Sequence, residues 1–204
     1  MIKNYRFPKF LRFVLGKNIL WQQPTENKSI YLTFDDGPTP EVTPKLLDLL
    51  DNENVRATFF CVGQNVERFP KLFTEIKNRG HRVGNHTFNH LKCFKTDFYS
   101  YINNVKKADE LIESNLFRPP HGQISRRIVN ALQSDFQIVM WDVITCDYDK
   151  MLSAEKILKN VRKYSRNGSI VVFHDSAKAQ KNMFATLPDA IKFWKSEGYA
   201  FGIL

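Results

Sequence analysis

The sequence predicts a single α/β domain in which about seven parallel strands alternate with helices and form a barrel or a closed-up sheet. Runs of β-branched and aromatic residues recur along the chain, and amphipathic segments separate them, which is typical of βα units rather than hairpins. The chain has 204 residues, 43% of them hydrophobic, which is enough for one sizeable core. The expected strands span residues 29–34, 57–62, 81–85, 116–118, 137–143, 169–174 and 199–204.

The helices are expected between these strands. The first should begin near Thr39, because a hydroxyl side chain and nearby prolines precede an apolar stripe at Leu46, Leu47, Leu49 and Leu50. Further helices are expected at 66–78, 97–114, 125–133, 153–165 and 187–197. Glycines that suit a left-handed C-cap follow at Gly80, Gly168 and Gly198. Residues 29–204 are therefore expected to form the one globular domain.

Charge and cysteine content limit the function classes. The 30 Lys and Arg outnumber the 21 Asp and Glu, but these basic residues are scattered and no nucleic-acid-binding motif accompanies them, so we expect no specific nucleic-acid partner. The 3 cysteines show no CxxC spacing, which argues against a disulfide framework or a thiolate zinc site. No signal peptide and no run of about 18 apolar residues is seen, so a cytoplasmic or membrane-peripheral location is expected. The sequence indicates no oligomeric state.

Residues 1–28 differ in composition and are expected to form a basic, aromatic N-terminal extension. Lysines and arginines interleave with aromatic and aliphatic residues as far as Trp21. Such a stretch could contact an anionic membrane or a cell-wall polymer. Packing against the outside of the barrel is the interpretation we favour, because Pro8 interrupts any helix.

Polar side chains lie at the ends of several expected strands. In a parallel α/β sheet, ligands bind beyond the carboxyl ends of the strands, so these residues should lie close together. They are Asp35 and Asp36 after the first strand, His86 and His90 after the third, Arg118 after the fourth, Asp142 on the fifth, and His174 on the sixth.

A metal site is one interpretation of these residues. The i, i+4 spacing of His86 and His90 puts two imidazoles on one side of a helical turn, where a carboxylate could complete an open, catalytic His₂Asp set. Alone, this spacing is equally compatible with two surface histidines. The adjacent Asp35 and Asp36 favour the metal, because neighbouring carboxylates repel unless a cation lies beside them. Zn²⁺ fits nitrogen and oxygen donors best, with Co²⁺, Ni²⁺ or Mn²⁺ as alternatives.

Four motifs together resemble a known family. They are Thr33-Phe34-Asp35-Asp36-Gly37-Pro38, His86-Thr87-Phe88-Asn89-His90, Arg118-Pro119-Pro120-His121-Gly122 and the late His174. In order and separation they resemble the motifs of polysaccharide deacetylases, the NodB-homology domain of carbohydrate esterase family 4. The resemblance extends from about residue 29 to the C-terminus. It implies a distorted (β/α) barrel that removes N- or O-acetyl groups from chitin, peptidoglycan, xylan or related glycans.

The resemblance also implies roles for individual residues. Asp35 would be the general base and His174 the general acid, while the metal ligands would be Asp36, His86 and His90. Arg118 would orient Asp35, and Thr87 would orient the histidine turn. A backbone N–H near His121, in the loop with Pro120 and Gly122, would hold the oxyanion. Tyr148, in another motif loop, could stack on a sugar ring.

The chain departs from the family pattern at three positions. His121 stands where many relatives have tyrosine, and Val172 stands where a leucine usually borders the acetyl methyl group. Ile144 replaces the first carboxylate of the fourth motif, of which only Asp147 and Tyr148 match. Asp142 is expected to supply the missing carboxylate partner for Arg118 or His174.

The leading hypothesis is a metal-dependent deacetylase that hydrolyses the N-acetyl group of peptidoglycan, a chitooligosaccharide or a related glycan through a metal-activated water. One alternative is a catalytically silent, glycan-binding member of the same fold, and another is an O-acetyl esterase. The silent member is less favoured, because this chain keeps the candidate base Asp35, the three candidate ligands and His174.

Overall fold

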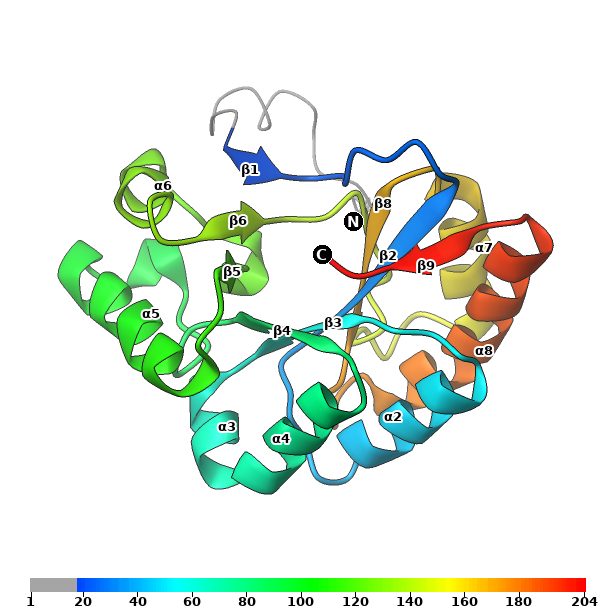
Figure 1. The fold of residues 1–204 in the computed structure, drawn as a ribbon, viewed down its shortest axis with the longest axis horizontal. Coiled ribbons are helices and arrows are strands. Elements are labelled where there is room, and N and C mark those ends of the chain that lie inside the picture. Colours follow the sequence, from blue (N-terminus) through cyan, green and yellow to red (C-terminus); the bar gives the residue numbers. More distant parts are fainter. Residues whose placement is uncertain (1–17) are drawn as a thin grey trace.

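The computed structural model describes residues 18–204 and shows one curled, parallel sheet with helices around its outside (Figure 1). The strands of the nine-stranded sheet follow the order β1-β6-β5-β4-β3-β2-β8-β7, and β9 also pairs with β2. They are β1 (Ile19–Leu20), β2 (Ser29–Asp35), β3 (Thr58–Cys61), β4 (Arg82–Asn85), β5 (Leu116–Phe117), β6 (Gln137–Val139), β7 (Val143–Ile144), β8 (Ser169–His174) and β9 (Ala200–Gly202). The predicted α/β barrel is therefore confirmed.

The helices cover the outer face of the sheet (Figure 1). They are α2 (Thr43–Asn52), α3 (Gly63–Arg68), α4 (Pro70–Asn78), α5 (Phe98–Ile112), α6 (Arg126–Leu132), α7 (Ala154–Tyr164) and α8 (Gln180–Ser196), with 3₁₀ turns η1 (Cys93–Lys95) and η2 (Pro120–Gly122). The helix expected over 66–78 is divided at Pro70, whose ring suits a first helical turn but not a helix interior. Thr39 does not cap α2, since its side chain makes no such bond and the N-cap position belongs to Val42.

The strand expected over 137–143 is two strands, β6 next to the β1 end of the sheet order and β7 at the other end. The N–H of Met140 still bonds to Leu20 of β1, whereas the N–H of Asp142 bonds to Ile170 of β8. The short link between β6 and β7 thus carries the chain from one end of the sheet to the other. This crossing brings the two ends together and closes the distorted barrel.

Alternation along β2 and β8 separates two apolar clusters and aims the polar residues inward. Phe34 and Phe173 pack in the outer cluster, between the sheet and the helices. Val172, the neighbour of Phe173 on β8, points to the opposite face of the strand and belongs to the second cluster. Asp35 and His174 are register neighbours at the carboxyl ends of these strands. The sheet therefore places a carboxylate and an imidazole side by side at one end of the barrel.

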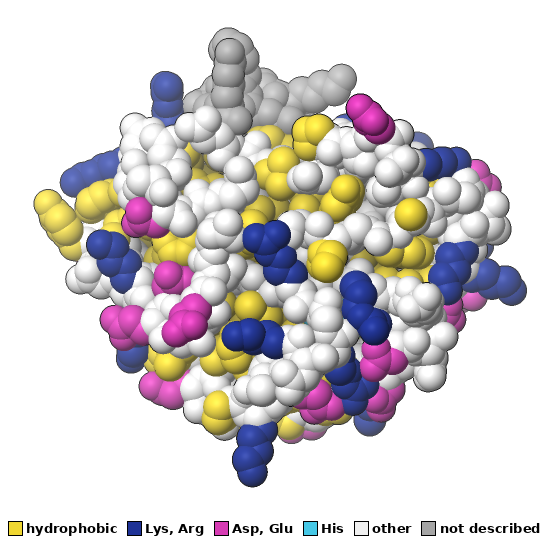
Figure 2. Space-filling view, viewed as in Figure 1, with side chains coloured by type: hydrophobic (Ala, Val, Ile, Leu, Met, Phe, Trp, Pro, Cys, Tyr) yellow, Lys and Arg dark blue, Asp and Glu magenta, His cyan; other side chains and the backbone are white. Residues whose placement is uncertain are grey.

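The part of the chain before β2 is only partly described. Of the predicted N-terminal extension, residues 1–17 lie outside the described residues, and β1 pairs in parallel with β6. The domain boundary at residue 28 stays a prediction. No helix within residues 18–204 is long and apolar enough to cross a membrane. On the face seen in Figure 2, basic side chains are dispersed and interspersed with acidic ones, as expected of a solvated surface.

Candidate active site and metal centre

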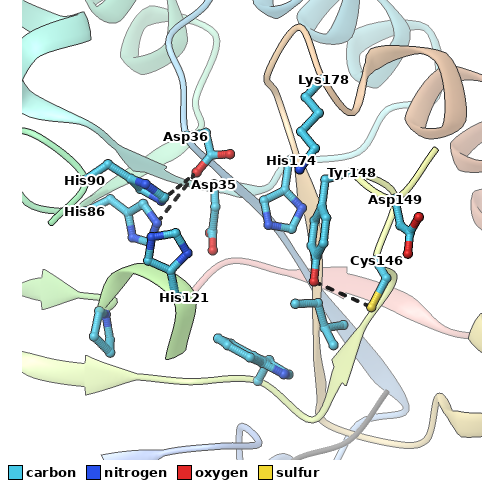
Figure 3. A pocket seen from close by; sticks show the side chains of 13 residues that line it. Asp35, Asp36, His86, His90, His121, Cys146, Tyr148, Asp149, His174 and Lys178 are labelled. Atoms are coloured by element: carbon cyan, nitrogen blue, oxygen red, sulfur yellow. Dashed lines mark hydrogen bonds and ion pairs between the residues drawn. The ribbon is translucent and has the colours of Figure 1, made fainter. Parts of the chain in front are cut away.

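Five of the seven predicted strand-end residues line a cavity of about 530 Å³ at the carboxyl ends of the strands, and the two that do not are Arg118 and Asp142 (Figure 3). Its walls combine acidic, imidazole and apolar side chains from separate segments of the chain. They are Asp35, Asp36, His86, His90, Pro119, His121, Trp141, Ile144, Cys146, Tyr148, Asp149, His174 and Lys178.

Asp36, His86 and His90 form a group that can hold a metal ion. Their candidate ligand atoms all lie within 4.8 Å of one another. Asp36 Oδ1 lies 3.2 Å from His90 Nε2 and 3.8 Å from His86 Nε2, and Figure 3 shows the three side chains pointing toward one another. Two imidazole nitrogens and one carboxylate oxygen suit a catalytic divalent ion such as Zn²⁺, because a fourth position stays open.

The surroundings of His86 prepare it for ligation. Its Nδ1 lies 2.7 Å from the carbonyl oxygen of Arg118, which can only accept, so Nδ1 donates and Nε2 keeps its lone pair toward Asp36. Burial lowers the pKa of His86 to about 4, so the ring is neutral at pH 7. Burial alone would raise the pKa of Asp36, but the hydrogen bond from His90 and the charges of nearby histidines lower it. Both groups therefore stand in the protonation state that a metal needs.

Asp35 and Arg118 form a buried ion pair beside this group. Arg118 Nη1 lies 2.6 Å from Asp35 Oδ1 and 2.8 Å from Thr33 Oγ1, and Arg118 is fully buried. Its guanidinium carbon lies 3.9 Å from the centre of the Phe60 ring. Arg118 thus orients Asp35 through its side chain and His86 through its carbonyl oxygen.

His174 lies across the cavity and is paired with Asp147. Its Nδ1 lies 2.7 Å from Asp147 Oδ1, and its backbone N–H donates to Asp147 Oδ2 at 2.9 Å. Burial alone would lower the pKa of His174, but the Asp147 carboxylate, with smaller contributions from Asp36 and Asp35, raises it to about 9. Because Nδ1 is occupied, Nε2 is the ring nitrogen left for a substrate. The edge-on ring of Tyr148 packs against His174 at 4.9 Å between ring centres.

The prediction that Asp142 would pair with Arg118 or His174 is wrong. Asp142 accepts two hydrogen bonds from Arg166 and one from Ser169, the first residue of β8, so it lies at the opposite end of that strand from His174. Its backbone lies beyond the end of β6, so a strand pattern continued from residue 137 misplaces its side chain. Asp147 is the partner that sequence reasoning missed, although it was the matching half of the fourth motif.

The predicted substrate-contacting residues divide into two groups. His121 and Tyr148 line the cavity, but Pro120, Gly122, Thr87 and Val172 are not among its lining residues, and Pro119 lies where Pro120 was expected. Val172 is fully buried beside its register partner Ile144, which lines the cavity in its place. Thr87 supports the histidine turn, since its Oγ1 accepts from the N–H of Leu91 at 3.2 Å. Four further lining residues were not predicted, namely Trp141, Cys146, Asp149 and Lys178.

Several residues with strained backbone conformations lie at the end of the barrel that holds the cavity. Five residues of the site and its loops have positive φ without being glycine, which is uncommon and is found mostly in turns and functional sites. They are Asp36 (85°), Thr87 (63°), His90 (55°), His121 (59°) and Cys146 (58°). Their surroundings must hold these conformations against a local cost of about 1 kcal/mol or more each.

The barrel and its cavity, which is lined by the His₂Asp group together with Asp35 and His174, match the class of protein that the motifs predicted, and the comparisons with known proteins agree. The family described as polysaccharide deacetylase matches residues 22–136. A peptidoglycan-N-acetylglucosamine deacetylase of Bacillus cereus is 39% identical over 160 residues, which cover 75% of this chain but only 58% of that protein. A second deacetylase of the same name and organism is 34% identical over 190 residues, covering 90% and 89% of the two chains.

Among solved structures, a peptidoglycan N-acetylglucosamine deacetylase in complex with 4-naphthalen-1-yl-N-oxidanyl-benzamide superposes with a TM-score of 0.89. It is 34% identical in sequence, and the match covers 97% of this chain and 95% of that one. The chain belongs to the polysaccharide deacetylase family, as its motifs predicted.

Proposed function

We propose that the protein is a metal-dependent deacetylase that hydrolyses the N-acetyl group of an N-acetylated glycan. The observation that carries this proposal is that Asp36, His86 and His90 share one cavity with Asp35 and His174, which are paired with the buried residues Arg118 and Asp147 respectively. Amide hydrolysis needs an activated water, a base and an acid. This cavity offers a metal-binding group to activate the water, Asp35 as the base and His174 as the acid.

A divalent ion held by Asp36, His86 and His90 would polarise the acetyl carbonyl and lower the pKa of a water. Zn²⁺ is the ion we propose, and Co²⁺, Ni²⁺ or Mn²⁺ could replace it at such a donor set. Asp35, fixed by Arg118, accepts the proton of the attacking water. The backbone N–H of His121, in the turn η2, is the donor that we propose for the developing oxyanion.

His174 gives a proton to the leaving amine. With a pKa of about 9, its imidazolium form predominates at neutral pH, and the bond from Nδ1 to Asp147 leaves the Nε2 proton for the substrate. An amine leaves poorly unless it is protonated, so this proton distinguishes amide from ester hydrolysis.

The two Bacillus cereus relatives support a peptidoglycan substrate with N-acetylglucosamine units. A chitooligosaccharide would present the same acetamido group. Action on a cell-wall polymer would place the protein at the cell envelope, whereas our sequence-based proposal is a cytoplasmic or membrane-peripheral location.

The test is acetate release from N-acetylated and O-acetylated glycans by metal-depleted protein with and without added Zn²⁺. We expect release from N-acetylated glycans that depends on the ion. Release from O-acetylated substrates alone would favour the esterase. Binding of glycans without any acetate release would favour the silent member of the fold.

A further inference from the structure

Asp36 adopts a backbone conformation that its own side chain does not favour. Its φ of 85° lies in the left-handed region, where a residue with a Cβ is strained. The direction of the Asp36 carboxylate depends on this backbone angle. The surroundings must therefore hold the peptide unit between Asp36 and Gly37 in place.

Two side chains form hydrogen bonds with that peptide unit, one with its carbonyl oxygen and the other with its N–H. Asn65, in the first turn of α3, donates from Nδ2 to the carbonyl oxygen of Asp36 at 2.8 Å. The N–H of Gly37 donates to Asp175 Oδ1 at 2.9 Å. With both its acceptor and its donor bound, this peptide plane cannot rotate without breaking a hydrogen bond.

Asp175 is itself held by further hydrogen bonds, which fix the position of its carboxylate. It is fully buried, its Oδ2 accepts from Thr43 Oγ1 at 2.7 Å, and its N–H donates to the carbonyl oxygen of Asp35 at 3.0 Å. A Cβ on Gly37 would lie 1.9 Å from Asp175 Oδ2, so only glycine allows this approach. None of the roles discussed above uses Asp175 or Asn65.

We propose that Asn65 and Asp175 are positioning residues, which form a clamp on the Asp36–Gly37 peptide unit and thereby aim the Asp36 carboxylate at His86 and His90. The clamp also links the two sides of the site, because Asp175 directly follows His174 on the chain. This inference rests on the proposed function, in which Asp36 binds a metal ion. Outer residues that orient ligands typically affect metal affinity by about 10–100-fold.

The test compares variants that break or keep the clamp. Asn65→Asp keeps the side-chain shape but replaces the donor with an acceptor, and Asp175→Ala removes the other hydrogen bond. Asp175→Asn keeps an oxygen that can accept from the N–H of Gly37, so this variant should retain the metal affinity of the parent. Asp142→Asn is the matched control, because Asp142 is an equally buried carboxylate beside the opposite end of β8.

Two measurements read the metal site without relying on turnover. Zn²⁺ affinity is measured by competition with a chelator, and the Co²⁺-loaded protein is compared by visible absorption, which reports the ligand geometry. We expect Asn65→Asp and Asp175→Ala to weaken Zn²⁺ binding by about 10–100-fold and to change the Co²⁺ spectrum. Asp175→Asn and Asp142→Asn should stay within about threefold of the parent.

The outcomes separate the clamp from the proposed function. Asn65→Asp protein that is folded by circular dichroism and binds both ions like the parent overturns the clamp, and so does an equal loss in Asp142→Asn. If Asp175→Ala does not fold, the Zn²⁺ affinity and the Co²⁺ spectrum of Asn65→Asp alone test the clamp. A parent protein that binds Zn²⁺ but deacetylates no glycan contradicts the proposed function. In that case the metal affinities of the variants still test the clamp. A parent that binds no ion contradicts both.

Discussion

The ion pair between Asp147 and His174 leads to a quantitative prediction about the pH dependence of deacetylation. His174 is 9% exposed, and burial alone would lower its pKa, but Asp147 at 2.7 Å, with smaller contributions from Asp36 and Asp35, raises it to about 9. Asp147→Asn removes the charge and keeps the shape. The pKa of His174 in this variant should therefore fall to its ordinary value of about 6.5 or lower.

The magnitude follows from these two pKa values. A fall from about 9 to about 6.5 is about 2.5 pH units, or about 3 kcal/mol in favour of the neutral ring. At pH 7.5 the protonated fraction of His174 drops from nearly all molecules to about a tenth. N-deacetylation should slow by about tenfold at this pH, and the alkaline limb should move by about 2.5 pH units toward acid. A bound divalent ion acts on His174 in both proteins, so the difference between them is the quantity to measure.

The assay is the pH profile of kcat/KM for acetate release from an N-acetylated oligosaccharide. Asp149→Asn serves as the control, because Asp149 also lines the cavity while the carboxylate bonded to His174 is that of Asp147. The alkaline limb of the Asp149→Asn profile should lie at the same pH as that of the parent. An alkaline limb that moves by less than about half a pH unit in Asp147→Asn would show that His174 is not the titrating acid.

Four further predictions follow from the site. Asp36→Ala, or the double variant His86→Ala with His90→Ala, should bind no stoichiometric Zn²⁺ by elemental analysis while circular dichroism shows a folded barrel; a full zinc complement in the double variant contradicts the ligand set. Asp35→Asn should keep the metal and lose most turnover, and the reverse result for Asp35 and Asp36 would exchange their roles. His174→Ala should slow N-deacetylation by about 10²–10⁴-fold but slow hydrolysis of an activated aryl acetate much less; equal losses would point to another proton donor. Since the pKa of His174 is raised on folding, its contribution to stability is present below about pH 6.5 and is lost as the pH rises through about 9. The melting temperature of the parent should therefore fall across this interval more steeply than that of His174→Ala; parallel curves would contradict the pairing.

Much of the site was predictable because strand ends in a parallel barrel meet. Asp35 and His174 each end a largely apolar strand, His86 directly follows β4, and topology alone brings such residues to one edge. The same reasoning failed at Asp142. It assumed a continuous strand with alternating faces, but regular pairing stops after Val139, and the side chain turns to the other end of β8.

The contacts of other site residues could not be predicted from a local sequence pattern. Asp147 follows a strand of only two residues, and its pairing with His174 depends on the register of β7 against β8. Asn65 and Asp175 act on a backbone peptide unit, which no side-chain motif reports. Lys178 reaches the cavity from the segment before α8, a helix that begins earlier than its apolar stripe indicated.

The distribution of unfavourable features across the molecule argues that this end of the barrel serves chemistry rather than folding. Arg118 and Asp35 are buried together, and replacing one partner of such a pair leaves a buried charge and typically costs about 3–5 kcal/mol. Asp36, His90 and His121 hold left-handed backbone angles nearby. In contrast, the outer cluster, which includes Phe34 and Phe173, is apolar and aromatic. The apolar clusters stabilise the fold, and that stability holds strained loops and buried charges in the arrangement that a deacetylase needs.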